Sequence, residues 1–281
     1  MLAHDHIISK AGLWSFKLFN SMVVLFFILP FVAIIPMSFS SGMFLSFPPP
    51  SFSTRWYSNF LSSASWNNAT ILSFEVAAIA MIFATLLGTL AALSVGQRVY
   101  PKKFPVFKTL LIGLFVSPAV CPIVVAAVAK LMFFLKINLY DTMTGLVIAH
   151  TVLGSPFVFI SVLSSLNNLD RSVEKAAANL GASHMQTLFR VTLPLIGPGV
   201  FLGAIFAFMN SFNEIVVTVF ITGTNAVTLS RKLWDGIQYE IDPTITVVST
   251  LLIVFSFIIF ALFSLLMRRT TITLSGFSRK G

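Results

Sequence analysis

Residues 245–267 read ITVVSTLLIVFSFIIFALFSLLM, and this stretch of 23 residues contains no charged side chain. A helix of that length extends about 35 Å at 1.5 Å per residue, which is enough to cross the hydrocarbon core of a bilayer. The apolar residues follow one another without the alternation that a transmembrane β-strand shows. Because hydrocarbon offers no hydrogen-bond partner to the backbone, only a helix satisfies such an isolated stretch. The sequence therefore predicts a membrane-spanning helix here.

Five further apolar runs precede this one, and the composition agrees with them. Hydrophobic residues make up 57% of the chain and charged residues 10%, with a mean hydropathy of +0.93, so too little polar surface exists for a water-soluble globule. The first run is too long for the hydrophobic part of a signal peptide and lacks a convincing cleavage site, so we expect it to be retained. We predict an all-α polytopic membrane protein with six transmembrane helices: roughly Leu18 to Phe39, Ala69 to Val95, Phe107 to Phe134, Thr144 to Leu166, Gly199 to Thr222 and Ile245 to Met267.

The basic residues are divided unequally between the two sides of these spans. Thirteen Lys and Arg residues fall in the two tails and in the loops after the second and fourth spans, whereas four fall in the loops opposite. Cytoplasmic loops carry the excess of Lys and Arg, so we expect both termini in the cytoplasm. The formal charge of +9 is scattered among these loops, and we do not expect a nucleic-acid partner.

Two features predict how the spans pack. Small residues, which let a neighbouring helix approach closely, recur at four-residue spacing in the second span: Ala80, Ala84, Gly88 and Ala92. Prolines lie inside the third span, at Pro118 and Pro122, and inside the fourth, at Pro156. Each proline frees a backbone carbonyl, so we expect both helices to be kinked.

The segment between the fourth and fifth spans, residues 167–198, is long enough to hold structure of its own. Arg171 to Leu180 predicts a short amphipathic helix that ends at Gly181. Ser183 to Val191 predicts a second short helix, which we expect Leu193-Pro194 to stop before the fifth span begins. The predicted result is a helix-turn-helix on the cytoplasmic face.

The same loop keeps the spacing of a known motif. Lys175-Ala176-Ala177, Gly181 and Val191-Thr192-Leu193-Pro194 resemble the EAA motif, E-A-A-x3-G-x9-I-x-L-P, of ABC importer membrane subunits. The motif's glutamate falls on Lys175, with Glu174 one residue earlier, and whether Glu174 compensates stays open. The resemblance implies a type I ABC importer permease fold in a bacterial inner membrane, with this loop gripped by a separate ATPase; the alternative is an amphipathic helix lying on the membrane. The implied ATPase-coupling residues are Glu174, Lys175, Ala176, Ala177, Gly181, Ala182, Val191, Leu193 and Pro194.

The chain carries neither a G-x-x-x-x-G-K-[ST] nor an H-E-x-x-H motif, and no pair of nucleophile and base argues for an enzyme. We therefore expect no catalytic residue, cofactor or metal on this chain, and ATP and Mg on partner subunits. The resemblance implies these partners: a second, related permease subunit, two ATP-binding subunits, a periplasmic solute-binding protein and membrane lipid. It suggests the following division: a cytoplasmic tail 1–17, a first span with a periplasmic loop 18–68, a core permease domain 69–267 and a cytoplasmic tail 268–281.

Several polar residues fall within the predicted spans. Asn210, Asn213 and Glu214 are spaced i, i+3 and i+4, which would place them on one face of a continuous fifth helix. An acid near the bilayer centre costs about 2.5–3.5 kcal/mol, so Glu214 predicts either a residue of the translocation pathway or a hydrogen-bonding anchor between helices. Glu75, near the outer end of the second span, is either a further pathway candidate or an acid that reaches water by a modest displacement. His150 is expected to be a hydrogen-bonded packing residue, with a proton relay as the alternative.

The last outer loop, residues 223–244, mixes both signs of charge. It predicts a surface that meets a periplasmic receptor, or a merely solvated loop. The receptor-facing candidates are Arg231, Asp235, Glu240 and Asp242.

The stretches 211–218 and 228–234 resemble the polyamine (spermidine/putrescine) branch of these permeases. That branch commonly has two acids where this chain has Asn213 and Glu214. The resemblance implies a polyamine or a related small organic cation as the solute. The alternatives are an importer of another small solute, such as an amino acid or derivative, a metal ion or an oxyanion, and a proton-coupled secondary carrier.

Overall fold

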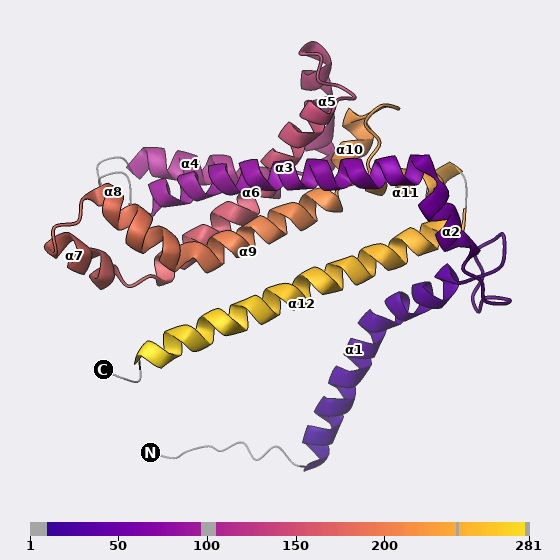
Figure 1. Cartoon of the computed structure of the whole chain (residues 1–281), viewed down its shortest axis with the longest axis horizontal. Helices are drawn as coiled ribbons and strands as arrows, with labels where there is room; N and C mark the ends of the chain where they lie inside the picture. The colour runs from indigo at the N-terminus through magenta and orange to yellow at the C-terminus, as the bar shows by residue number, and fades with distance from the viewer. Residues whose placement is uncertain (1–9, 97–104, 240–241, 279–281) are drawn as a thin grey trace. The chain divides into compact units, whose positions relative to one another are not determined.

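The computed structural model describes residues 10–96, 105–239 and 242–278, with the backbone alone at 10–12, 105 and 266–278. The regular elements in these ranges are all helical (Figure 1). They are α1 (Lys10–Ser38), α2 (Arg55–Ser62), α3 (Ala64–Val95), α4 (Pro105–Val120), α5 (Ile123–Lys136), α6 (Met143–Asn168), α7 (Arg171–Asn179), α8 (His184–Thr187), the π-helical turn η1 (Leu188–Thr192), α9 (Leu193–Phe212), α10 (Val216–Ile221), α11 (Leu229–Tyr239) and α12 (Thr244–Ser278).

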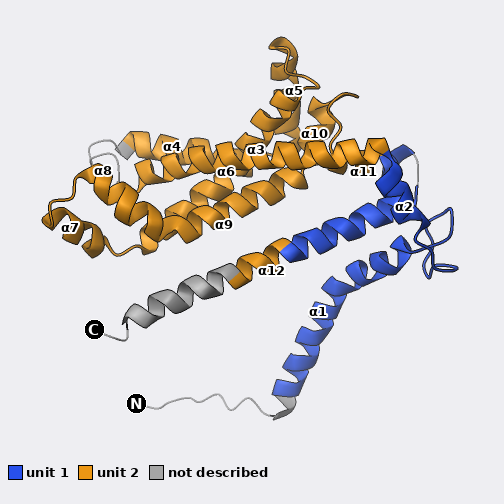
Figure 2. Cartoon of the chain, viewed as in Figure 1, with its two compact units in different colours: residues 1–63, 236–258 blue, residues 64–235, 259–281 orange. Residues whose placement is uncertain are grey.

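The chain divides into two compact units (Figure 2). The first comprises Met1–Ser63 and Gly236–Ile258, and the second comprises Ala64–Asp235 and Ile259–Gly281. Within the described residues, five helices are long and apolar enough to cross a membrane, and a sixth span is reached if the bent pair α4 and α5 counts as one. The predicted all-helical, multi-span fold is confirmed.

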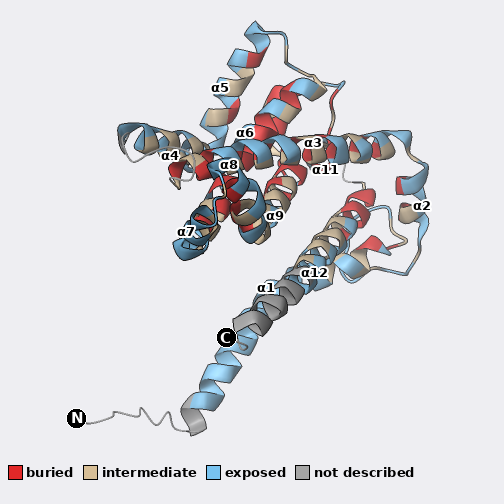
Figure 3. Ribbon diagram, turned by 60° about the vertical axis from the view of Figure 1, so that its left-hand side comes forward, coloured by how far each residue is buried: buried red, intermediate tan, exposed pale blue. Residues whose placement is uncertain are grey.

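The second unit is built on α3, α6 and α9, which pack against one another along their lengths (Figure 1). The predicted stripe of small residues in the second span is buried in this contact, as the buried positions along α3 show (Figure 3). A Cβ on Gly88 would lie 2.7 Å from the Cβ of Val158, and one on Gly203 would lie 2.7 Å from the Cα of Val158. The absence of side chains at these two glycines is what lets α3 and α9 approach α6 so closely.

The third apolar run is not one helix. It divides at Cys121-Pro122 into α4 and α5, whose axes meet at 104°. Pro122 has no N–H to donate, and the residue before a proline disfavours helical geometry, so the helix ends there. A kink was the expectation for the continuous span Phe107 to Phe134, and a full break replaces it. Pro118 and Pro156 lie inside α4 and α6 without ending them.

The fifth apolar run begins earlier than predicted, because helical structure is continuous from His184 to Phe212. The expected stop at Leu193-Pro194 is wrong. In a regular α-helix the ring of Pro194 would clash with a carbonyl of the preceding turn. Here the preceding turn is π-helical, and the N–H of Leu193 bonds to the carbonyl of Leu188, five residues back. Pro194 then lies in the first turn of α9, where the lack of an N–H is tolerated.

In the first unit, hydrogen bonds order the segment between α1 and α2. Ser40 and Phe52 form an antiparallel bridge that closes the connecting segment. The indole of Trp56 donates a 3.1 Å hydrogen bond to the carbonyl of Gly42, and the hydroxyls of Ser38 and Tyr57 lie 2.8 Å apart. These contacts fix the segment between α1 and α2 without regular secondary structure.

Candidate functional site

The loop with the EAA-like spacing folds as the predicted helix, turn and helix. Asp170 caps α7 by accepting a 2.9 Å hydrogen bond from the N–H of Ser172, whose hydroxyl donates to the same carboxylate at 2.6 Å. These two bonds from Ser172 hold the pKa of Asp170 below its usual value. α7 ends at Asn179, and the turn that follows contains Gly181, whose φ of +86° is a left-handed conformation that glycine adopts without strain. A capping box between Ser183 and Gln186 then starts α8.

Glu174 lies on the inner side of this loop. Its carboxylate accepts a 2.7 Å hydrogen bond from the hydroxyl of Thr192, a residue of η1 that is only 2% exposed. This bond connects α7 to η1, at the start of the fifth span. Beside it lies a pocket of about 360 Å³, which is lined by Arg171, Glu174, Lys175, Ala178, Ala182, His184, Thr187, Leu188 and Thr192.

The remaining motif residues divide between an exposed set and a packed set. Lys175, Ala176 and Gly181 are exposed, and α7 contains no buried residue (Figure 3). Ala177, Ala182, Val191 and Leu193 are half-buried, whereas Pro194 is exposed. The loop therefore presents the outer face of α7 to its surroundings, while Glu174 is directed toward the rest of the chain.

The fifth span is interrupted at its other end, between α9 and α10. The helix ends at Phe212, so Asn210, Asn213 and Glu214 do not share a helix face, and that expectation is corrected. Asn213 is exposed and its amide returns to the carbonyl of Met209 at 2.9 Å, whereas Glu214 is 8% exposed. The carboxylate of Glu214 accepts a 2.8 Å bond from the N–H of Val217, which caps the first turn of α10.

Side chains from other helices complete the hydrogen bonds of this break. The hydroxyl of Ser230 donates a 2.8 Å bond to the carbonyl of Phe212. His150, on α6, is 1% exposed and lies between the two half-helices, with Nδ1 2.7 Å from the hydroxyl of Ser211 and Nε2 3.1 Å from that of Thr218. The expectation of a hydrogen-bonded packing histidine is confirmed. Backbone that leaves helical geometry at membrane depth requires such partners.

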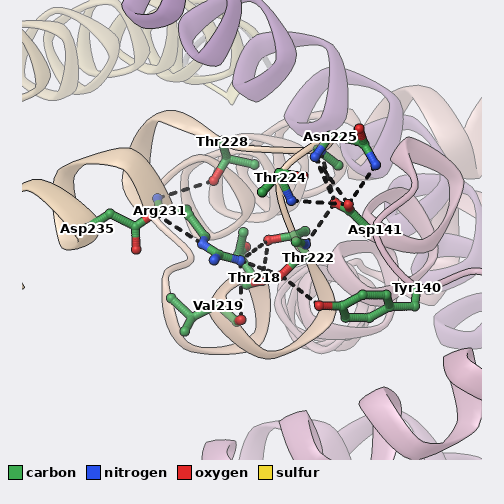
Figure 4. A network of polar contacts seen from close by, with 12 residues as sticks. Tyr140, Asp141, Thr218, Val219, Thr222, Thr224, Asn225, Thr228, Arg231 and Asp235 are labelled. Atoms are coloured by element: carbon green, nitrogen blue, oxygen red, sulfur yellow. Dashed lines mark hydrogen bonds and ion pairs between the residues drawn. The ribbon is translucent and has the colours of Figure 1, made fainter.

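Asp141, which the sequence did not single out, holds the segment that follows α10 (Figure 4). Its carboxylate accepts hydrogen bonds of 2.8 to 3.3 Å from four consecutive N–H groups, those of residues 223–226, and a further bond from the amide of Asn225. Burial acts to raise the pKa of this carboxyl, but the four N–H groups together lower it below its usual value. Asp141 itself has a φ of +56°, a left-handed conformation that Asp adopts more readily than most residues.

The predicted receptor-facing residues are largely engaged within the chain. Arg231 hydrogen-bonds the hydroxyl of Thr222 at 2.6 Å, the carbonyl of the same residue, and the carbonyl of Val219 at 3.3 Å (Figure 4). Its Nε also lies 3.4 Å from the carboxylate of Asp235. Arg231 therefore places a positive charge at the C-terminal end of α10, where the helix dipole favours it.

The other candidates have separate positions. Asp242 caps α12 by accepting a 2.9 Å bond from the N–H of Thr244, and Glu240 lies outside the described residues. Glu75 is exposed on α3. Among the described residues, no cluster of three or more His, Cys, Asp or Glu side chains could hold a metal ion.

Known proteins are similar to this chain in sequence or in fold. Residues 84–272 match the family described as binding-protein-dependent transport system inner membrane component. The spermidine/putrescine transport system permease protein PotC of Escherichia coli K12 is 28% identical over 253 residues, which is 90% of this chain and 94% of PotC. The putrescine transport system permease protein PotI of the same organism is 30% identical over 210 residues, which is 72% of each chain.

Two solved structures share the fold. A chain of a bacterial ABC transporter involved in the import of alginate gives a TM-score of 0.71 at 15% identity, covering 92% of this chain and 96% of that one. A chain of an amino acid ABC transporter gives 0.57 at 18% identity, covering 75% of this chain and 98% of that one. This protein therefore belongs to the family of binding-protein-dependent transport system inner membrane components, the permease subunits of ABC importers.

Proposed function

We propose that this permease forms half of the solute pathway of an ATP-driven importer and transmits the work of a separate ATPase through the loop 167–198. The observation that carries the proposal is the bond between Glu174 and Thr192. It joins the exposed helix α7 to a span that runs unbroken to Phe212, so a displacement of α7 is delivered to the membrane helices. ATP and Mg would bind to the partner subunits and not to this chain.

The proposed assembly contains a second, related permease, two ATP-binding subunits and a periplasmic solute-binding protein. Both termini and α7 would face the cytoplasm of a bacterial cell, in accord with the unequal distribution of Lys and Arg. We propose the division into domains given by the sequence, with 69–267 as the core permease domain. The outer loop 223–244 would meet the binding protein, chiefly through Asp235 and its neighbours, since the side chain of Asp235 is 37% exposed against 17% for Arg231.

A polyamine or a related small organic cation is the proposed solute. The similarity to PotC and PotI supports this class, and the acid Glu214 beside the exposed Asn213 supports a cation-attracting break in the fifth span. Asn210 and Glu75 are further candidates for the pathway. The single acid of this chain, where the polyamine branch commonly has two, would weaken its preference for a dication.

Reconstitution of the whole complex in proteoliposomes tests this function. With ATP inside and loaded binding protein outside, we expect uptake of radiolabelled putrescine or spermidine that stops when ATP is omitted. A cysteine introduced at Ala177 should crosslink to the ATP-binding subunit, whereas one at Val124, on the distant helix α5, should not. Uptake that follows a proton gradient in the absence of ATP would support the secondary carrier instead and overturn the proposal.

A further inference from the structure

His150 belongs to a chain of hydrogen bonds, and the partner of Thr218 favours one direction along this chain. The hydroxyl of Thr218 donates its single proton to the carbonyl of Glu214 at 3.1 Å. A tautomer of His150 with the proton on Nε2 fits this arrangement, because the oxygen of Thr218 then accepts from the ring while its own proton goes to Glu214. Nδ1 of the neutral ring is consequently an acceptor, and the hydroxyl of Ser211 donates to it at 2.7 Å.

The chain of bonds crosses the break in the fifth span. It starts at Ser211, in the last turn of α9, passes through the ring from α6 and Thr218 of α10, and ends on the backbone of Glu214 inside the break. In each of these bonds the donor is the group that comes earlier in the order Ser211, His150, Thr218 and Glu214. His150 is 1% exposed and Thr218 fully buried, so water does not compete for these groups.

We propose that His150, as the neutral Nε2–H tautomer, is the positioning residue that holds the two halves of the fifth span and thereby the carboxylate of Glu214 in one arrangement. The proposal rests on the function proposed above, because it concerns the break that we assign to the solute pathway. The physical reason is that two half-helix ends meet without a continuous backbone ladder, and a break of this kind keeps one geometry only if side chains bridge it. His150 bridges it with one donor and one acceptor, a combination that an imidazolium lacks because both of its nitrogens donate.

Transport by the reconstituted complex tests this role with size-matched variants. Thr218→Val keeps the shape of the side chain and removes its hydroxyl, and His150→Phe keeps a buried ring without the nitrogens. We expect each of these two variants to lower ATP-dependent uptake at least ten-fold while the complex assembles in normal amounts. Thr218→Ser, which keeps the hydroxyl, should retain uptake close to that of the unmodified complex. A matched control is Ser155→Ala, since Ser155 is also buried on α6 but bonds to Val152 of its own helix at 3.1 Å.

The tautomer itself can be observed independently of transport. Nitrogen-15 NMR of the complex labelled at histidine, assigned by comparison with His150→Phe, should give a protonated Nε2 and an unprotonated Nδ1. Wild-type uptake by both Thr218→Val and His150→Phe, or a signal from the opposite tautomer or from an imidazolium, would overturn the proposal. Failure of the unmodified complex to take up any amine would instead count against the proposed solute, and the tautomer would still be measurable.

Discussion

Thr192, in the π-helical turn that begins the fifth span, donates a 2.7 Å hydrogen bond to Glu174, eighteen residues earlier on α7. Thr192 is buried, whereas Lys175, which falls at the glutamate position of the motif, is exposed. The neighbouring residues Glu174 and Lys175 therefore have different surroundings. Glu174 joins the loop to the span, and at the exposed Lys175 we expect, under the proposed function, a contact with the ATPase.

Removing the hydroxyl of Thr192 should loosen α7. Thr192→Val keeps the shape of the side chain and deletes the bond to Glu174, which contributes about 1 kcal/mol for a pair that is partly exposed. We expect hydrogen exchange of the α7 amides to become about five-fold faster and solute-stimulated ATP hydrolysis to fall. Thr192→Ser retains the hydroxyl and is the control. Equal exchange in Thr192→Val and the unmodified protein would show that the bond does not hold the loop.

A second prediction concerns the turn at Gly181 and tests whether its left-handed backbone conformation is needed for coupling. Nothing lies within 4 Å of the position that a Cβ would take there, so a larger residue meets no neighbour. Its φ of +86° nevertheless strains a residue with a side chain, by about 1–2 kcal/mol. We expect Gly181→Val to abolish stimulated ATP hydrolysis while the protein still inserts into the membrane.

The substitution Gly181→Asn distinguishes backbone strain from the effect of simply adding a side chain, because Asn adopts left-handed conformations more readily than most residues. We expect Gly181→Asn to retain most of the stimulated hydrolysis that Gly181→Val loses. If both variants hydrolyse ATP normally, the turn is not needed for coupling.

The sequence predicts much of this fold because the deciding signals are local. Apolar runs of membrane length, the stripe that includes Ala84 and Gly88, and the glycine at 181 each depend on residues within a few positions of one another. Pro194 was misleading for a physical reason. A proline ends a helix only if its ring meets a carbonyl of the preceding turn, and the π-helical turn before Pro194 was not visible in the composition of the segment.

The interruption of the fifth span and the role of Asp141 required the structure. No proline or glycine marks the end of α9 at Phe212, and the only local signal is a polar pair followed by the β-branched run 215–219, whose helix propensity is low. The hydrogen-bond partners of Asp141 lie more than 80 residues along the chain. A single sequence contains no pattern that pairs such distant segments.

Asp141 should make the segment 223–226 sensitive to acid. Its folded pKa is below the usual 3.8, so the negative carboxylate contributes its full stabilisation above that pH, and the contribution is lost as pH falls below 3.8. We expect amide exchange at residues 223–226, corrected for the intrinsic effect of pH, to be unchanged between pH 7 and 5. Asp141→Asn should accelerate that exchange at neutral pH, because an amide has a single acceptor oxygen without charge.

Asp170→Asn is the matched control, since Asp170 also has a lowered pKa but caps α7 in a different part of the second unit. It should leave exchange at 223–226 unaffected. Unchanged exchange in Asp141→Asn would mean that the segment is held by Arg231 and the packing of α10 alone.

Glu214 can be tested for two tasks with two substitutions. The amide of Glu214→Gln still offers an oxygen to the N–H of Val217 and so keeps the cap of α10, but it removes the negative charge. If the carboxylate also attracts a cationic solute, ATP-dependent uptake of putrescine should fall about ten-fold, as the loss of about 1.5 kcal/mol of charge-assisted bonding implies. Glu214→Ala removes both the charge and the cap.

Asn213 offers the complementary gain, because it is exposed beside the buried Glu214. Asn213→Asp supplies a second acid at the break, so uptake of the dication putrescine should rise relative to that of a monoamine, measured in the same proteoliposomes. The variants Glu214→Gln and Glu214→Ala separate the two tasks of Glu214, which are the attraction of a cation and the capping of α10. Normal uptake in Glu214→Gln, together with its loss in Glu214→Ala, would identify Glu214 as a helix cap alone, and the polar residues of the pathway would have to lie elsewhere in the assembled pair of permeases.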